Sequence, residues 1–95
     1  MSAERVFLPE DVPEIERHFR LQFEATQSAW VLLYPEGMVK LSTSAGEIMK
    51  RIDGRATVND VVTNLEETFP GADLRQDVMN FLKVAHERGW IGSKQ

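Results

Sequence analysis

The hydrophobic pattern of this chain changes its period at Ser42, and no other feature of the sequence restricts the fold as strongly. Before Ser42, apolar residues recur at every second position over residues 18–24, and residues 29–34 are apolar throughout. Period two is typical of a half-buried antiparallel strand, and a short apolar run is typical of a central strand covered on both faces. After Ser42 the apolar residues recur at helical spacing. Strands therefore precede helices, and this order predicts an α+β domain.

A turn at Pro35-Glu36-Gly37 is expected to return the chain from residues 29–34 into a third strand at residues 38–42. Proline favours the second position of such a turn, and glycine tolerates the positive φ that closes it. The alternation predicts two inward and two outward side chains: Val39 and Leu41 inward, Met38 and Lys40 outward. The three strands then form an antiparallel meander with residues 38–42 at its edge.

Three helices are predicted to follow the meander. Ser44 and Glu47 have the spacing of a capping box at the start of the first helix, and Gly54 supplies its end. Thr57, with Asp60 three residues later, marks the start of the second helix. The three predicted helices cover residues 44–53, 57–69 and 74–88.

Residues 1–17 are predicted to form an extended N-terminal arm ahead of a single domain at residues 18–92. Pro9 and Pro13 interrupt any helix in the arm, and each favours extended geometry in the residue before it. The apolar residues 6–8 leave two alternatives, a free terminus or a segment that docks on the domain. A chain of 95 residues supplies only one core, so a second domain is not expected.

No combination of side chains in this sequence indicates catalysis. The chain has no cysteine, which excludes disulfides, thiolate nucleophiles, Cys-ligated zinc and iron–sulfur clusters held by the chain itself. Neither His18 nor His86 has a nucleophile or an acid at a spacing that forces contact. The acidic residues are scattered, at positions typical of helix caps and solvated faces. We therefore expect no enzyme activity, no catalytic or metal-binding residues and no cofactor.

Charge and hydropathy disfavour two classes of partner. The net charge is −4, whereas a protein that binds duplex nucleic acid usually carries a basic patch that displaces counterions from phosphate. No apolar run approaches the ~20 residues that a membrane-spanning helix needs, and the N-terminus has no hydrophobic signal core. The expectation is a cytoplasmic protein that binds neither nucleic acid nor a membrane.

The third predicted helix has a wider apolar surface than packing against one small sheet requires. Val78 falls in its core-facing arc, and a neighbouring stripe combines the apolar Met79 and Leu82 with Arg75. This mixture suits the wall of a groove; alternatively, Met79 and Leu82 pack against the first or second helix. An edge strand at residues 38–42 presents unpaired main-chain groups, so an extended peptide could add to it as a fourth strand facing this wall.

Three segments of the sequence, in this order, resemble the pyrroloquinoline quinone biosynthesis protein D family. Residues 29–41, AWVLLYPEGMVKL, are similar to the AWVLLxPExxVxL segment of that family. Residues 45–58 are similar to its AxEILxxxDGxxTV segment, with Met49 in place of the commoner Leu and Gly46 in the first helical turn. Residues 81–90 are similar to its closing helix and RGW ending. The resemblance covers most of the chain.

The resemblance implies a winged helix-turn-helix-like fold of the kind that recognises the leaders of ribosomally made, modified peptides. It implies binding to a precursor peptide whose Glu and Tyr side chains become the quinone cofactor. It also implies delivery to a radical S-adenosylmethionine (SAM) enzyme, whose iron–sulfur clusters belong to that partner. In related modules the peptide lies along the third strand beside the last helix. The peptide-binding residues implied for this chain are Met38, Val39, Lys40 and Leu41 on the strand and Arg75, Val78, Met79 and Leu82 on the helix.

Two other functions stay open at this point. A winged-helix DNA-binding regulator would share the architecture, because a fold does not fix a function. Its recognition helix would be the third, which is only faintly basic, with Arg75, Lys83, His86 and Arg88 against Asp77 and Glu87. A structural subunit could instead form a homodimer through the same edge strand, and such a dimer could coexist with peptide capture.

Overall fold

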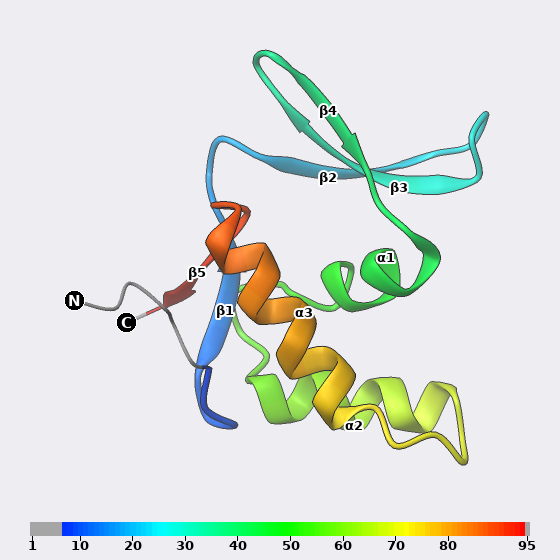
Figure 1. Cartoon of the computed structure of the whole chain (residues 1–95), viewed down its shortest axis with the longest axis vertical. Coiled ribbons are helices and arrows are strands. Elements are labelled where there is room, and N and C mark those ends of the chain that lie inside the picture. The colour runs from blue at the N-terminus through cyan, green and yellow to red at the C-terminus, as the bar shows by residue number, and fades with distance from the viewer. Residues whose placement is uncertain (1–6, 95) are drawn as a thin grey trace.

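The computed structural model describes residues 7–94, which form three helices and two antiparallel sheets (Figure 1). The elements in chain order are β1 (Val12–Ile15), β2 (Arg20–Glu24), β3 (Ala29–Tyr34), β4 (Gly37–Lys40), α1 (Thr43–Met49), α2 (Val58–Thr68), α3 (Arg75–Glu87) and β5 (Ile91–Lys94). Strands β2, β3 and β4 form one sheet with β3 at its centre, and β1 pairs with β5 in the other. Figure 1 shows the three-stranded sheet at one end of the molecule and the β1–β5 pair beside α3.

The β2–β3–β4 sheet confirms the predicted meander and the predicted α+β class. Both pairings are antiparallel, and the register places Leu21 opposite Leu32 and Leu32 opposite Val39. One row of apolar side chains therefore crosses a single face of the sheet. Leu32 is fully buried, and Leu21 and Val39 pack against the core. Because residues alternate between faces, this row fixes which side chains of β4 face inward.

The start of α1 differs from the prediction. Its N-cap is Ser42, whose hydroxyl accepts a hydrogen bond from the Ala45 N–H (3.2 Å). Ser44 lies inside the helix, and the Glu47 carboxylate bonds to Arg51 instead of closing a capping box. A serine at either position could cap a helix through its hydroxyl, but only Ser42 has the extended backbone that an N-cap requires.

The second helix begins after Thr57, as the sequence predicted, and its start is closed by a capping box. The Thr57 hydroxyl accepts from the Asp60 N–H and the Asp60 carboxylate accepts from the Thr57 N–H, each at 3.0 Å. The N-cap of α3 is Leu74, which has no side chain that could cap the helix. Glu66 of α2 accepts a hydrogen bond from the Leu74 N–H (3.0 Å), so one helix supports the start of the next.

The β1–β5 sheet was not predicted and ties the two ends of the described chain together. Its register pairs Val12 with Lys94 and Ile15 with Ile91. Phe7 and Pro13, both in the segment expected to be an arm, are buried. Residues 7–17 therefore pack against the rest of the domain, whereas residues 1–6 of that segment lie outside the described range.

A single apolar cluster connects the sheet and the three helices. Its buried members are Phe7, Leu32, Leu41, Ala45, Ile48, Met49, Ile52, Val58, Val61, Val62, Leu65, Val78, Leu82, Ala85 and Ile91. No helix within residues 7–94 is long and apolar enough to cross a membrane.

Candidate functional site

The outer edge of β4 carries main-chain groups that the rest of the described chain does not pair. β4 is hydrogen-bonded to β3 on one side only. The N–H of Leu41 donates to the carbonyl of Trp30 (2.9 Å), so the main chain of Leu41 faces β3. In an antiparallel pair the groups of successive residues point to opposite sides. The N–H and C=O groups of Met38 and Lys40 therefore point away from β3, toward solvent.

The side chains of β4 separate into an anchoring pair and an exposed pair. Leu41, directly after the strand, is buried in the core, and Val39 is half-buried against it. Met38 is 48% exposed and Lys40 is also exposed. The inward and outward assignments made from the sequence are confirmed. The anchoring pair holds the strand in place while the exposed pair presents its outer edge.

The four residues predicted on α3 do not form one continuous wall. Leu82 is fully buried and Val78 nearly so, both within the core cluster. Met79 is half-buried against that cluster. Arg75 is exposed, and its guanidinium donates to the Asn59 side-chain oxygen of α2 (2.6 Å). The wide apolar face of α3 is thus used largely for packing, in line with the alternative interpretation of its sequence.

An apolar pocket of about 270 Å³ opens where the three helices meet, and Val78 is the predicted site residue that lines it. The other lining residues come from the start of α1, the end of α2 and the start of α3: Thr43, Ser44, Glu47, Ile48, Leu65, Phe69, Leu74 and Asp77. Phe69 is 44% exposed. Helical spacing from Val62 and Leu65 would predict a buried Phe69, and its position directly before Pro70 is the one signal that it projects from the helix end.

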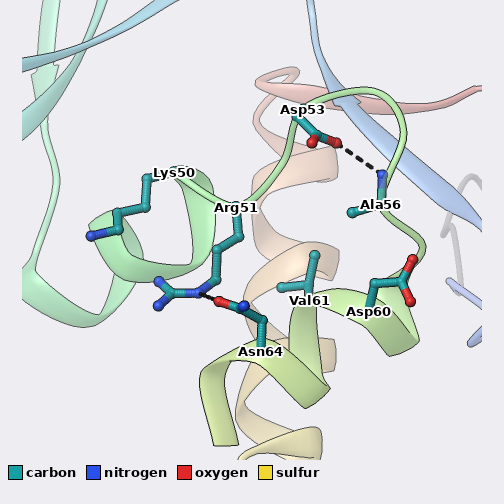
Figure 2. A pocket seen from close by; sticks show the side chains of 7 residues that line it. All are labelled: Lys50, Arg51, Asp53, Ala56, Asp60, Val61 and Asn64. Atoms are coloured by element: carbon teal, nitrogen blue, oxygen red, sulfur yellow. Dashed lines mark hydrogen bonds between the residues drawn. The ribbon is translucent and has the colours of Figure 1, made fainter. Parts of the chain in front are cut away.

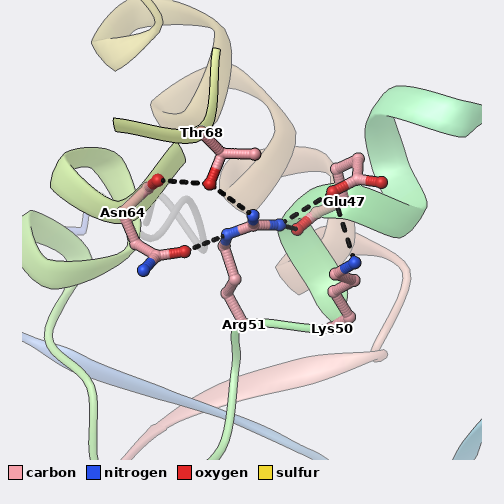
Figure 3. A network of polar contacts seen from close by, with 5 residues as sticks. All are labelled: Glu47, Lys50, Arg51, Asn64 and Thr68. Atoms are coloured by element: carbon pink, nitrogen blue, oxygen red, sulfur yellow. Dashed lines mark hydrogen bonds and ion pairs between the residues drawn. The ribbon is translucent and has the colours of Figure 1, made fainter. Parts of the chain in front are cut away.

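A polar network anchored on Arg51 sets the position of α1 relative to α2 (Figure 3). The Arg51 side chain, only 12% exposed, donates to the carboxylate of Glu47 (2.9 Å) and to the side chains of Asn64 (2.5 Å) and Thr68 (3.2 Å) on α2. The hydrogen bond from Arg51 holds the pKa of Glu47 below its usual value. Because Glu47 lines the apolar pocket, this network also fixes one side of its opening.

A second hollow, of about 290 Å³, lies between the end of α1 and the start of α2 (Figure 2). Its polar side chains are already engaged in the fold. Asp53 accepts from the N–H groups of Arg55 and Ala56, and the Ala56 hydrogen bond in particular lowers the pKa of Asp53. Asp60 caps α2, and Asn64 accepts from Arg51. This hollow therefore lies at the joint between two helices, and its lining residues contribute to holding that joint.

Each histidine contacts an aromatic ring. His18 packs against Phe19 with the two rings tilted, and His86 makes an edge contact with Phe7, with ring centroids 5.9 Å apart. Within residues 7–94, no three His, Asp or Glu side chains come together in a group that could hold a metal ion. The most distinctive surface of the described chain is the unpaired edge of β4.

Comparison with known proteins points to one family. The sequence model of the family described as coenzyme PQQ synthesis protein D (PqqD) matches residues 29–91. A PqqA binding protein of Pseudomonas paraeruginosa is 52% identical over 86% of this chain and 90% of its own length. A PqqA binding protein of Acinetobacter baylyi is 44% identical over 96% of this chain and 97% of its own length.

The fold agrees with a solved member of the same family. The solution NMR structure of the PqqD truncation of Methylobacterium extorquens PqqCD is described as a functional, stand-alone recognition element for a ribosomally synthesised and modified peptide. It superposes with a TM-score of 0.75 at 28% sequence identity, covering 90% of this chain and 94% of that one. Sequence match, identity and fold together show that this chain belongs to the PqqD family.

Proposed function

We propose that this chain is a non-catalytic adaptor of pyrroloquinoline quinone biosynthesis that binds the precursor peptide PqqA as an added strand along β4. The observation that carries the proposal is the set of outward main-chain groups at Met38 and Lys40. Strand addition needs such an unpaired edge, because main-chain hydrogen bonds supply the affinity. The names of the relatives supply the identity of the guest.

The exposed side chains next to this edge suit an extended guest. Met38 offers an apolar, flexible contact surface, and Lys40 offers a cation to an acidic guest side chain. Leu41 and Ser42 connect β4 directly to α1, whose first turn lines the apolar pocket. A guest that continues past Lys40 along this path reaches the pocket, where one of its apolar side chains can be buried against Val78. Arg75, Met79 and Leu82 then act through the position of α3.

Presentation to a radical SAM enzyme is the second part of the proposal. The chain has no cysteine, so the iron–sulfur clusters of that chemistry must belong to the partner. An adaptor that holds the peptide as an edge strand leaves the outer edge of the peptide, and those of its side chains that point away from the adaptor, accessible to an enzyme. The rival function of DNA binding would need the cations of α3 to face a duplex. One of them, Arg75, instead donates its guanidinium to Asn59 of α2.

The test is a titration of labelled PqqA peptide into two variants at one position. Lys40→Pro removes the outward N–H, and the β3–β4 ladder does not use that N–H, so the fold should tolerate the change. We expect Lys40→Pro to weaken peptide binding by about tenfold or more, the effect of leaving one main-chain partner unsatisfied. Lys40→Ala keeps the N–H and should bind within about threefold of the parent.

Circular dichroism and thermal unfolding establish that both variants are folded before the titrations are compared. Amide chemical-shift changes on adding peptide should concentrate in β4 and around the apolar pocket. A folded Lys40→Pro variant that binds PqqA as tightly as the parent shows that the edge of β4 is not the binding site.

A further inference from the structure

The pocket where the three helices meet has an apolar floor and a polar rim. Its floor is formed by Ile48, Leu65 and Val78, all of which are buried in the core. Its rim includes Ser44 in the first turn of α1 and Asp77 in the first turn of α3, and both are exposed. A ligand that fits this pocket therefore combines an apolar body with a polar group at the level of the rim.

The carboxylate of Asp77 is free to bind a ligand because another acid takes its usual hydrogen-bond partner. Asp77 is the third residue of α3, the position from which an acid ordinarily accepts from the N–H of the N-cap residue. The N-cap here is Leu74, and its N–H donates to Glu66 of α2 instead (3.0 Å). Within residues 7–94, no hydrogen bond or ion pair engages the Asp77 carboxylate. An ionised carboxylate only accepts hydrogen bonds, so it suits a ligand that brings a donor.

The size of the pocket suits an aromatic ring. Its volume is about 270 Å³, whereas an apolar cavity of about 150 Å³ in another protein is enough to bind benzene. One aliphatic side chain would leave much of this space empty, and the lining atoms would lose van der Waals contacts. A single ring with a polar substituent, or two fused rings, would fill it better.

The ring of Phe69 lies at this pocket and is 44% exposed. Its position is fixed by the end of α2, because its N–H donates to the Leu65 carbonyl (2.9 Å) and the following Pro70 cannot continue the helix. A guest ring in the pocket would cover part of Phe69. Aromatic pairs of this kind are stabilised beyond the burial of their surface.

The walls of the pocket are held in place by side chains of α2. Asn64 and Thr68 accept hydrogen bonds from Arg51 at the end of α1, as Figure 3 shows, and Glu66 accepts from Leu74 at the start of α3. The pocket is thus formed before a guest arrives. Binding there costs little ordering of the protein, which favours affinity.

We infer that this pocket is a subsite for one aromatic side chain of the precursor peptide, whose ring carries an N–H or O–H donor as in tryptophan or tyrosine. The inference rests on the proposed function, since a guest added to β4 passes Ser42 on its way to the pocket. The ring lies on the apolar floor beside Phe69, and its donor bonds to the Asp77 carboxylate. A ring held between three helices is an anchor of the peptide and not a side chain that the partner enzyme modifies.

Small probes test the pocket without strand addition. The N-acetyl amides of tryptophan, tyrosine, phenylalanine and leucine are titrated into the protein, and amide chemical shifts are followed. We expect shifts at Ser44, Phe69 and Val78 but not at Lys40. The tryptophan and tyrosine derivatives should bind about three- to tenfold more tightly than the phenylalanine derivative, which has a ring but no donor. The leucine derivative should bind most weakly.

Three variants identify the groups responsible. Asp77→Ala removes the acceptor and should abolish the preference for rings with a donor. Asp73→Ala is the matched control, because it removes the same charge from an exposed residue that does not line the pocket, and it should keep the preference. Ser44→Leu extends an apolar side chain into the pocket from α1 and should prevent binding of all four probes. Circular dichroism establishes that each variant is folded.

Two outcomes of the probe titrations overturn the inference. In the first, the phenylalanine derivative binds the parent as tightly as both derivatives with a donor, or no probe shifts the pocket residues. In the second, Asp77→Ala keeps the preference of the parent. A preference that is present in the parent and in Asp73→Ala, and absent in Asp77→Ala, supports the inference.

Titrations with PqqA separate the subsite from the proposed function. Each aromatic residue of PqqA is replaced in turn by leucine. At one position the replacement should weaken binding to the parent by about tenfold and binding to Ser44→Leu by less than about twofold, because the pocket of that variant is already filled. If Lys40→Pro weakens PqqA binding and Ser44→Leu does not, strand addition stands and the subsite is wrong. If neither weakens binding, both proposals are wrong.

Discussion

At the scale of single residues, Gly46 shows how one missing side chain allows the sheet to approach the helices. A Cβ atom built at Gly46 would lie 2.8 Å from the Cδ1 atom of Trp30, well inside van der Waals contact. Trp30 in turn makes an edge contact with Phe23, which limits its freedom to move away. The glycine that the sequence places in the first turn of α1 therefore serves close packing.

We predict that Gly46→Ala destabilises the domain by about 1–2 kcal/mol. The higher helix propensity of alanine should raise the free energy of unfolding by about 0.5–1 kcal/mol. Overpacking against Trp30 should lower it by about 1–3 kcal/mol, and this effect dominates. Urea unfolding followed by tryptophan fluorescence measures the free energy of unfolding and also reports a displacement of the Trp30 ring. The control is Gly37→Ala, whose Cβ would make only ordinary contacts with Tyr34, at 3.5 Å or more, and should change stability by less than about 0.5 kcal/mol. A more stable Gly46→Ala variant would contradict this account.

At the scale of elements, Arg51 links the short helix α1 to α2. α1 has only seven residues and would be marginal alone, so its stability depends on contacts with its neighbours. The guanidinium bonds to Glu47 on one helix and to Asn64 and Thr68 on the other. The same contact lowers the pKa of Glu47, so the link between the helices depends on pH.

The sign of this dependence follows from the direction of the pKa shift. The folded-state pKa of Glu47 lies below its ordinary value of 4.5, so its contribution to stability is complete above that value and is lost as the pH falls through the folded pKa. We predict that Glu47→Gln lowers the free energy of unfolding by about 1 kcal/mol at pH 7, with a smaller difference at pH 3. Urea unfolding at both pH values measures it. Arg51 makes the largest contribution to the shift, so the pH-dependent effect of Glu47→Gln should be smaller in an Arg51→Gln background, where only the Lys50–Glu47 ion pair (3.6 Å) remains.

The elements that the sequence predicted are those specified by local patterns. Strands β2–β4 and the three helices follow from the hydrophobic period and from caps such as Thr57. The β1–β5 sheet joins residues about eighty positions apart, and Pro13 and Gly92 weaken the strand pattern in both. The edge position of β4 follows from strand order alone. The burial of Leu82 in the core could not be predicted in the same way, because a wide apolar helix face does not reveal which part of it the core covers.

At the scale of the whole molecule, the N-terminal segment completes the core. Phe7 is only 3% exposed and contacts His86 of α3, and main-chain bonds join Pro9 and Asp11 to the start of α2. A small domain buries little apolar surface, so one buried aromatic side chain is a substantial part of its core. The segment that the proline pattern assigns to an arm is therefore structural from residue 7 onward.

We predict that Phe7→Ala lowers the free energy of unfolding by about 3 kcal/mol, as expected for loss of a buried aromatic side chain. Such a change lowers the melting temperature of a domain this size by more than about 10 °C. Leu8→Ala is the adjacent control: Leu8 is 50% exposed, so its truncation should change stability by less than about 1 kcal/mol. Differential scanning calorimetry compares the two. Equal melting temperatures would mean that the Phe7 ring contributes no more to stability than the exposed Leu8 side chain.

The pairing of Val12 with Lys94 also determines how this domain can be joined to other proteins. The first and last strands run side by side next to α3, whereas the β3–β4 hairpin projects at the top of the view, away from that pair (Figure 1). An enzyme or reporter fused through a linker upstream of β1 would be tethered at nearly the same point as one fused downstream of β5. Either order of fusion keeps the attached protein at a distance from the tip of the hairpin.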